Sequence, residues 1–267
     1  MKKIGVIYYN WPGFTFEQFL KFASGTGYEY FEMPVSLVWN KSEADPEDTA
    51  RQTAALIGKY GMKVSAVSSE NDFVQPDAPS RQAQADRMKR VSGLARILGC
   101  NVLRTEGGTP KSSVPESKWA ESIADCLKRC CEWADDLDMH FAVDNHGTIS
   151  NDADLQLKVF KSVGSKRVGA NLDTMNYRWF GYEVGQLNRI YEMIAPYTLH
   201  THIKDGKGSR GGYKGAALGD GEIDLQFAVK CLKAAGYSGV WVAEYEGPEA
   251  EGGVGYAKCF KWLKGNV

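Results

Sequence analysis

Residues 140–173 read HFAVDNHGTISNDADLQLKVFKSVGSKRVGANLD, and this stretch indicates how the chain folds. Two apolar runs, 140–146 and 168–173, have the length and composition of β-strands. Between them, residues 152–163 have the spacing of an amphipathic helix, which ends at Gly164 as helices commonly do. A strand–helix–strand unit with short connections predicts two parallel strands joined by a crossover helix.

The same unit recurs along the whole chain. Further strands are predicted at 2–8, 28–33, 63–69, 101–106, 197–205 and 239–246. Further helices are predicted at 15–25, 46–60, 79–98, 115–138, 183–195, 224–235 and 249–264. No linker or change in composition divides the sequence. Eight such units in 267 residues predict one α/β domain spanning 1–267, a closed (β/α)8 TIM barrel rather than an open sheet.

Composition narrows the class of protein. The formal net charge of -1 argues against a protein that binds nucleic acid. No segment approaches the roughly 18 apolar residues of a membrane span, and the N-terminal apolar run is too short for a secretory leader. Six cysteines form no Cys-x-x-Cys pair, and Cys126, Cys130 and Cys131 lie in a predicted helix, where buried thiols are expected. We therefore expect a cytoplasmic protein.

In a (β/α)8 barrel, functional side chains lie at the carboxyl ends of the strands. Four consecutive predicted strands end in Asp144, Asp173, His202 and Glu244. Side chains alternate along a strand, so His146 shares the face of Asp144. If these faces point inward, the carboxylates repel one another unless a cation lies between them. Oxygen ligands with one imidazole predict one divalent ion, which could be Mn, Co, Mg or Zn.

Each of these residues also has an ordinary structural interpretation. An aspartate at a strand end commonly caps a turn or a helix, and a histidine in a strand is commonly a hydrogen-bonded core residue. Glu244 lies inside the apolar run VWVAEYE, where a carboxylate is costly without a partner. Their occurrence at the ends of four consecutive strands favours a shared site.

Other side chains are candidates for substrate binding. Lys204 and Arg210 could hold substrate oxygens or could be solvated loop cations. Arg104 and Glu32 could support the site from neighbouring strands or form a structural ion pair. Aromatic residues after the strands could stack on a sugar ring or pack between helices; they are Trp11, Phe14, Trp39, Phe73 and Trp179.

A glycine-rich stretch, KDGKGSRGGYKGAALGDG (204–221), follows the seventh predicted strand. Its backbone amides could cradle an anion, although it matches no phosphate-binding motif. We expect it to form a flexible lid over the mouth of the barrel. The four histidines divide differently: His200 shares the inward face of His202, whereas His140 begins its strand at the far end and is expected to be structural.

Several of these stretches resemble the xylose isomerase-like barrels of the sugar phosphate isomerase/epimerase family. The similarity runs almost end to end and is carried by FEMP, GMKVSAVSS, LGCNVLRTEGG, FAVDNHG, VGANLDTMN, LHTHIKD and ALGDGEIDLQFAVKCLKAAGYSGVWVAEYEG. It implies a metal held at the positions of Asp144, Asp173, His202 and Glu244, and a possible homo-oligomer.

The chain departs from the family pattern at two of its site positions. Asp144 stands where the family usually has Glu, which withdraws the carboxylate by about 1.5 Å, one C–C bond. Asn176 stands where several members have a His that contacts the substrate or acts as a base. Both departures put the usual pair of bases in doubt.

The resemblance and the predicted site together lead us to expect a metal-dependent sugar isomerase or epimerase. Glu244 would abstract a proton next to a carbonyl of a ketose or related polyol, and Asp144 or His146 would return it through an enediolate. A lyase or dehydratase acting on a keto-sugar or 3-keto-glycoside, with His146 as the acid, is the alternative. A non-catalytic sugar-binding barrel is a further alternative. Four histidines and a near-neutral charge argue against the family's nuclease branch.

Overall fold

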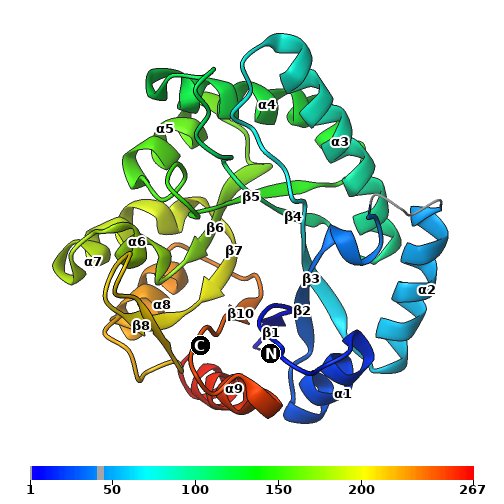
Figure 1. Cartoon of the computed structure of the whole chain (residues 1–267), viewed down its shortest axis with the longest axis vertical. Helices are drawn as coiled ribbons and strands as arrows, with labels where there is room; N and C mark the ends of the chain where they lie inside the picture. The colour runs from blue at the N-terminus through cyan, green and yellow to red at the C-terminus, as the bar shows by residue number, and fades with distance from the viewer. Residues whose placement is uncertain (1, 41–44) are drawn as a thin grey trace.

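The computed structural model describes residues 2–40 and 45–267. Eight parallel strands close into a barrel, which confirms the predicted α/β fold (Figure 1). Each strand pairs with its neighbour along the chain, and β10 pairs with β1 to close the ring. The barrel strands are β1 (Ile4–Ile7), β2 (Tyr30–Pro34), β3 (Lys63–Ser68), β4 (Val102–Thr105), β5 (His140–Asp144), β6 (Val168–Asp173), β7 (Thr198–Ile203) and β10 (Trp241–Ala243).

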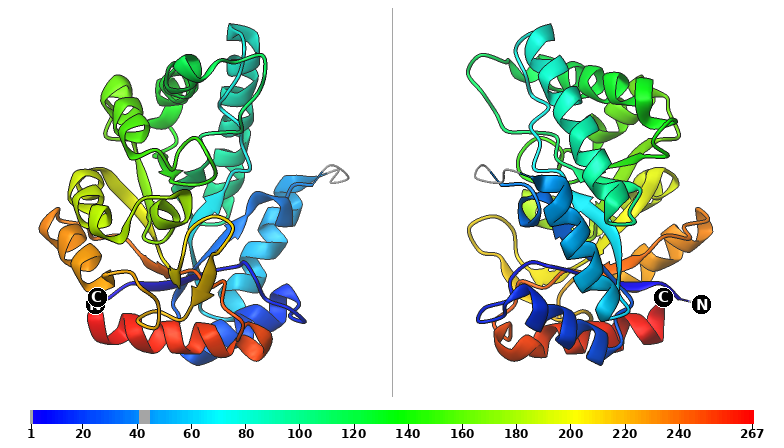
Figure 2. Two further views of the ribbon diagram at one scale, coloured as in Figure 1. Left: turned by 60° about the vertical axis from the view of Figure 1, so that its left-hand side comes forward. Right: turned by 90° about the vertical axis from the view of Figure 1, so that its right-hand side faces the viewer.

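Helices connect the strands and cover the outside of the barrel (Figure 2). They are α1 (Phe16–Thr26), α2 (Pro46–Lys59), α3 (Ala78–Ile97), α4 (Trp119–Ala134), α5 (Ala153–Val163), α6 (Asn176–Phe180), α7 (Val184–Ile194), α8 (Leu225–Ala234) and α9 (Val254–Asn266). Single 3-10 turns occupy Val35–Leu37, Glu116–Lys118, Ala195–Tyr197 and Glu251–Gly253. None of the helices in 2–40 and 45–267 is long and apolar enough to cross a lipid bilayer.

Capping residues fix where several helices begin. Thr15 and Gln18 form a reciprocal capping box at the start of α1, in which each side chain accepts a backbone N–H of the other residue. Asp77 and Asp152 accept the free amides that open α3 and α5. The short helix α6 directly follows β6 and was not predicted, because five residues are too few to establish a helical period.

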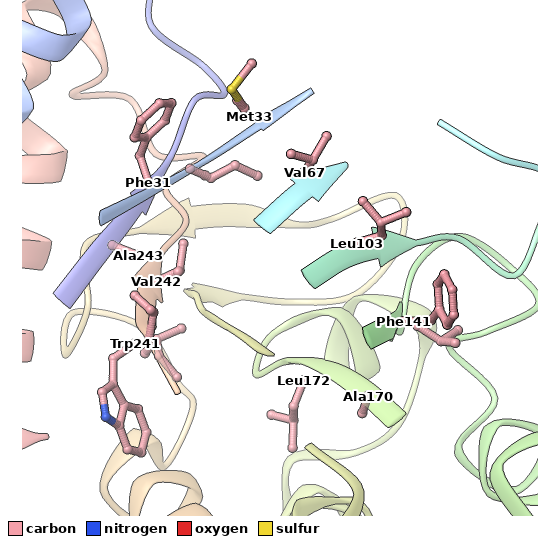
Figure 3. Close-up of a cluster of buried hydrophobic side chains, with 14 of the residues drawn as sticks. Phe31, Met33, Val67, Leu103, Phe141, Ala170, Leu172, Trp241, Val242 and Ala243 are labelled. Carbon is pink, nitrogen blue, oxygen red and sulfur yellow. The ribbon is translucent and has the colours of Figure 1, made fainter. Parts of the chain in front are cut away.

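Apolar side chains that point outward from the strands form the core between barrel and helices (Figure 3). Phe31, Met33, Val67, Leu103 and Phe141 are fully buried there. Each such side chain contributes about 1.5–3 kcal/mol through the apolar surface it removes from water. Alternation along the same strands turns the intervening residues toward the barrel interior, where the polar side chains gather.

An irregularity between β6 and β7 sets the level of the site residues. The pairing shifts between Ala170 and Asn171, after which Asp173 lies opposite His202. Gly169 permits this close approach, since a Cβ there would lie 2.0 Å from the carbonyl oxygen of Tyr197. The shift therefore brings an aspartate and a histidine from adjacent strands to one height in the barrel.

The glycine-rich stretch after β7 is folded into an antiparallel hairpin, β8 (Asp205–Lys207) and β9 (Lys214–Ala216). Its amides do cradle an anion, but that anion is the chain's own Asp205 carboxylate. This carboxylate accepts N–H groups of Gly206, Gly219, Gly221 and Ile223 at 2.9–3.3 Å. A Cβ at Gly221 would lie 1.8 Å from Asp205 Oδ1, so only glycine fits at that position.

Cys126 and Cys130, predicted as buried thiols in a helix, are buried in α4. In the described part of the chain all six cysteines are free, and Cys131 is half-buried. Burial raises the pKa of Cys126 to about 12, so this thiol is protonated and unreactive near neutral pH. Cys126 and Cys130 therefore contribute to packing.

Candidate metal centre

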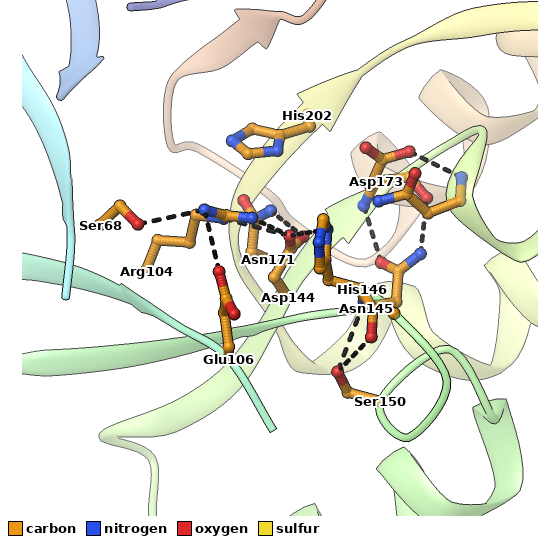
Figure 4. Close-up of polar contacts among 12 residues, drawn as sticks. Ser68, Arg104, Glu106, Asp144, Asn145, His146, Ser150, Asn171, Asp173 and His202 are labelled. Atoms are coloured by element: carbon orange, nitrogen blue, oxygen red, sulfur yellow. Dashed lines mark hydrogen bonds and ion pairs between the residues drawn. The ribbon is translucent and has the colours of Figure 1, made fainter. Parts of the chain in front are cut away.

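Polar side chains from β5, β6, β7 and β10 and the loops after them meet at the carboxyl-terminal mouth of the barrel. Figure 4 shows those of Asp144, Asp173 and His202. Asp144 ends β5, Asp173 ends β6, and His202 lies near the end of β7. Lys204 and Glu244 follow directly after β7 and β10. All five side chains are buried, so their charges must be balanced inside the protein.

Three of these residues form a group that could hold a metal ion. One ligand atom each from Asp173, His202 and Glu244 can be chosen so that all lie within 4.8 Å of one another. His202 Nδ1 lies 2.8 Å from Glu244 Oε2. Asp173 Oδ1 accepts the N–H groups of Met175 and Asn176, whereas Asp173 Oδ2 is buried and has no hydrogen-bond partner among the described residues.

The orientation of His202 is fixed from the opposite side of its ring. His202 Nε2 lies 2.6 Å from Glu32 Oε2, a buried carboxylate on β2. Glu32 thus contacts one ring nitrogen and leaves Nδ1 directed toward Glu244 and Asp173. A carboxylate behind a histidine commonly sets the tautomer that ligates a metal. Glu32 therefore supports the site through His202.

Asp144 makes other contacts in this structure. Its Oδ2 is paired with the Arg104 guanidinium, whose Nε lies 3.1 Å away, and its Oδ1 accepts from Asn171 Nδ2 at 2.5 Å. Asp144 is not part of the group of candidate metal ligands formed by Asp173, His202 and Glu244. His146 Nδ1 lies 3.7 Å from Asp144 Oδ2 with its side chain half exposed. Metal binding by Asp144 stays a prediction.

A buried chain of hydrogen bonds extends behind Asp144. Asn171 Oδ1 lies 2.8 Å from His200 Nδ1, and His200 Nε2 lies 3.2 Å from Ser65 Oγ. Burial lowers the pKa of His200 to about 4, so its ring is neutral near pH 7. A neutral ring that donates from Nδ1 to Asn171 can accept from Ser65 at Nε2. His200 thus orients Asn171, which in turn holds Asp144.

Charge balance controls protonation at the centre. Burial raises the pKa of Asp173 to about 7, with Glu244 and Asp144 adding to the rise and Lys204 opposing it. Burial alone would raise the pKa of Glu244, but Lys204 and His202 hold it well below its usual value. Burial alone would lower the pKa of His202, but Glu32 and Glu244 raise it well above its usual value. A metal ion that bound His202 would displace a proton.

The donor set fits a divalent ion. Two permanent cations among the described residues, Arg104 and Lys204, face six carboxylates at the mouth, from Glu32, Glu106, Asp144, Asp173, Glu244 and Glu246. Asp173 Oδ2 has no hydrogen-bond partner among the described residues, and the neighbouring His202 Nδ1 is directed at the Glu244 carboxylate. Carboxylate oxygens with one imidazole suit Mn, Co, Mg or Zn. Asp173, His202 and Glu244 would hold such an ion.

Some of the other predicted substrate-binding residues lie at the mouth of the barrel, and others are buried in the packing between strands and helices. Lys204 Nζ donates to Asn176 Oδ1 at 3.2 Å, so the structure brings these two together. The Arg210 guanidinium lies 4.8 Å above the Trp179 ring at the surface of the mouth. Trp11 is buried and stacks on Tyr256 at 4.2 Å, which matches the packing alternative.

Two further aromatic residues also take the packing alternative. Phe73 is fully buried, and the ring of Trp39 lies under the guanidinium groups of Arg87 and Arg90. His140 is at the opposite end of β5 from the site, 3.5 Å from Arg167 Nη1, in keeping with a structural role.

Two asparagines that shape the site were missed in the sequence. Asn171 lies two residues before Asp173, so the period of two that linked other site residues could have identified it. Asn145 accepts the Asp173 N–H at 2.8 Å and donates to the Asp173 carbonyl at 3.0 Å, which locks β5 to β6 beside the site. The period of two does not indicate Asn145, because it falls between Asp144 and His146, on the opposite face of the predicted strand.

The comparisons with known proteins agree with this fold. Residues 20–265 match the family described as Xylose isomerase-like TIM barrel. No curated protein sequence matches the chain. A structure of the IolI protein with a bound zinc atom is 16% identical, with a TM-score of 0.79 and 99% of both chains covered.

Two enzyme structures are similar over the same extent. The D-psicose 3-epimerase of Clostridium cellulolyticum H10, solved with D-tagatose, is 13% identical, with a TM-score of 0.77 and 99% of both chains covered. The probable 3-DHS dehydratase AsbF of Bacillus anthracis is 15% identical, with a TM-score of 0.75 and the same coverage. At these identities the likeness concerns the fold. Because the family match spans nearly the whole chain, this protein belongs to the xylose isomerase-like TIM barrel family.

Proposed function

We propose that this protein is a divalent-metal-dependent enzyme that abstracts a proton next to a carbonyl of a carbohydrate, as a sugar isomerase or epimerase. The observation that carries the proposal is the buried group of Asp173, His202 and Glu244, in which Asp173 Oδ2 has no hydrogen-bond partner among the described residues. The sugar epimerase among the similar structures is consistent with a carbohydrate substrate.

Residues at the mouth of the barrel would carry out the successive proton transfers of this reaction. Glu244, whose pKa is held low, is an ionised carboxylate that can accept a proton from the carbon next to the carbonyl. The C–H electron pair then moves into the carbonyl and gives an enediolate. A divalent ion bound at the site would polarise the carbonyl and stabilise the developing negative charge. Return of a proton by Asp144 or His146 on the opposite face gives the epimer, and return of a proton to the neighbouring carbon gives the isomer.

The contacts of Asp144 favour a second candidate, a lyase or dehydratase. Arg104 and Asn171 occupy both oxygens of Asp144, so this carboxylate is poorly placed to act as a second mobile base. His146 beside it is exposed enough to meet a substrate and can carry a proton. Glu244 would remove the proton, and a group on the β-carbon would leave with a proton from His146. This reaction needs one base and one acid.

The first experiment measures metal content and proton exchange together. Elemental mass spectrometry of the purified protein should find about one equivalent of Mn, Co, Mg or Zn, and Glu244→Gln should lose most of it. Ketoses and 3-keto-glycosides incubated in D₂O should incorporate deuterium next to the carbonyl, as seen by proton NMR. An epimer or isomer as the product supports the first candidate, and an eliminated product supports the second.

Glu249→Gln is the matched control, because Glu249 follows Glu244 in the same loop but pairs with Lys258 at the surface. It should keep both metal and exchange. A wild-type protein that binds none of the four ions, even after incubation with each, would contradict the proposal. Such a result would favour a barrel that binds sugar without catalysis.

A further inference from the structure

Lys204 occupies an unusual position for a lysine. Its side chain is buried at the mouth of the barrel, and Nζ lies 3.0 Å from Glu244 Oε1 and 2.9 Å from Glu246 Oε2. The same ammonium lies 3.2 Å from Asn176 Oδ1 and 3.9 Å from Asp173 Oδ2. A single cation thus contacts the two carboxylates, Asp173 and Glu244, that would also ligate a metal.

Asp173 and Glu244 cannot bind a divalent ion closely while they also pair with Lys204. Unit charges about 4 Å apart interact by several kcal/mol at the effective dielectric near a protein surface, so a divalent ion beside Lys204 would be strongly repelled. If Lys204 moved away from Glu244, the buried ammonium would depend on its remaining acceptors, Glu246 and Asn176. Metal binding therefore requires that these acceptors hold the ammonium group.

Of these two acceptors, Glu246 is placed to hold the ammonium group. Its side chain is 24% exposed, compared with 10% for Glu244, so it lies on the solvent side of the ammonium. The hairpin fixes its backbone, because a Cβ at Gly215 would lie 2.4 Å from the Glu246 carbonyl carbon. The Tyr213 ring, 5.9 Å from Nζ, forms the wall above Lys204. A short outward movement would leave the lysine paired with Glu246 alone.

We propose that Lys204 is an internal competitor of the divalent ion, which neutralises Asp173 and Glu244 until a metal binds and then pairs with Glu246. Lys204 would thereby set the metal affinity of the site as a positioning residue. The displaced ammonium, still at the mouth, would be available to a substrate oxygen. The inference rests on the metal site of the proposed function.

The test compares metal affinities after the resident metal is removed with a chelator. Mn²⁺ and Zn²⁺ are titrated separately into wild type, Lys204→Gln and Lys204→Met by isothermal titration calorimetry. Both variants should bind metal about tenfold or more tightly, because a nearby positive charge is lost. Lys207→Met, at an exposed lysine of the same hairpin, should match wild type. The glutamine variant keeps a hydrogen-bond donor for Glu244 if the methionine variant does not fold.

Glu246→Gln distinguishes a specific role from a general effect of charge. This variant should bind both ions about three- to tenfold more weakly, since the displaced lysine loses its acceptor. In the Lys204→Gln background the same change should have almost no effect, because no ammonium needs an acceptor. An equal loss in both backgrounds would overturn the role of Glu246.

The outcomes separate this inference from the proposed function. Equal metal affinity in wild type, Lys204→Gln and Lys204→Met would overturn the competition and leave the metal site intact. Binding of neither ion by any of the variants would overturn the metal site itself. Tighter metal binding in the two Lys204 variants would support the inference. In the presence of chelator these variants should also have a lower Tm than wild type, because Asp173 and Glu244 then have neither the metal nor Lys204 as a partner.

Discussion

At the scale of single residues, the site is organised by partners that hold its ligands. Glu32 holds His202 from behind, and Arg104 holds Asp144. Burial alone would raise the pKa of Glu32, yet His202 and Arg104 outweigh it and lower that pKa. Both supporting residues are therefore charged near neutral pH, and each can be tested by neutral replacement.

Glu32→Gln should weaken metal binding without loss of the fold. A glutamine contacts His202 without its negative charge and no longer fixes which ring nitrogen is free, and losses at such supporting positions are typically about 10- to 100-fold in metal affinity. Titration with Mn²⁺ and Zn²⁺ measures the change. Glu29→Gln, an exposed residue just before β2, is the control and should bind as wild type does. Unchanged affinity in Glu32→Gln would show that the contact does not position His202.

Arg104→Met should destabilise the fold by about 3–5 kcal/mol, because it leaves the buried Asp144 carboxylate without its cation. Urea unfolding followed by circular dichroism measures the difference. Arg167→Met removes a surface arginine that also pairs with two carboxylates, Asp135 and Asp138, and should cost less than about 1 kcal/mol. Equal losses in the two variants would argue that the Asp144 pair is not desolvated.

At the scale of elements, the hairpin β8–β9 is the part of the fold that closes over the site. It depends on one carboxylate, since Asp205 accepts the N–H of Gly206 in β8 and three backbone amides from the loop that returns to α8. The Arg178–Glu222 ion pair at 2.8 Å ties the same loop to α6. The hairpin thereby keeps Tyr213 over Lys204.

Asp205→Ala should loosen the hairpin more than the barrel. Several amide donors lose their acceptor, at a cost of about 1–3 kcal/mol for each donor that stays buried. Hydrogen–deuterium exchange measured by mass spectrometry should therefore accelerate in 205–223 and change little in the barrel strands. Asp220→Ala, at an exposed aspartate of the same loop, should leave exchange as in wild type. Unaltered exchange in Asp205→Ala would rule out this carboxylate as the anchor.

At the scale of the whole molecule, a bound metal should stabilise the closed barrel. The three proposed ligands come from β6, β7 and the loop after β10, so the ion would bridge parts of the chain that lie far apart in sequence. An ion at 100 times its dissociation constant adds about 2.7 kcal/mol to the free energy of unfolding. That gain should raise Tm by about 5 °C or more, as measured by calorimetry with and without chelator.

This stabilisation should increase with pH. Asp173 has a pKa of about 7 in the fold against an ordinary value of 3.8, so in the metal-free protein its ionisation reduces stability as pH rises between these values. A metal needs the ionised form, so its affinity should rise as pH approaches and passes about 7. The Tm difference should thus be larger at pH 8 than at pH 6, and Glu244→Gln should show none at either pH. A pH-independent difference in wild type would contradict this assignment of Asp173.

The sequence by itself determined the barrel and the level of its site. Strand and helix periods are local properties, and eight units with short connections admit one closed parallel arrangement. The period of two placed Asp173, His202 and Glu244 at the ends of predicted strands, and the structure brings them together with Glu244 directly after β10. The sequence led us to expect a flexible lid and did not indicate the hairpin. The Asp205 contacts that hold the hairpin join residues up to 18 positions apart, which local sequence patterns do not show.

Only the tertiary structure decided how the charges pair. Spacing predicts which side chains point inward, but not which of several acids a buried cation will contact. The structure pairs Arg104 with Asp144, Lys204 with Glu244 and Glu246, and Glu32 with His202, and each pair joins different strands or the loops that follow them. Those partners are set by the β6–β7 shift and by barrel closure, because desolvated charges take the partner that three-dimensional packing brings nearest.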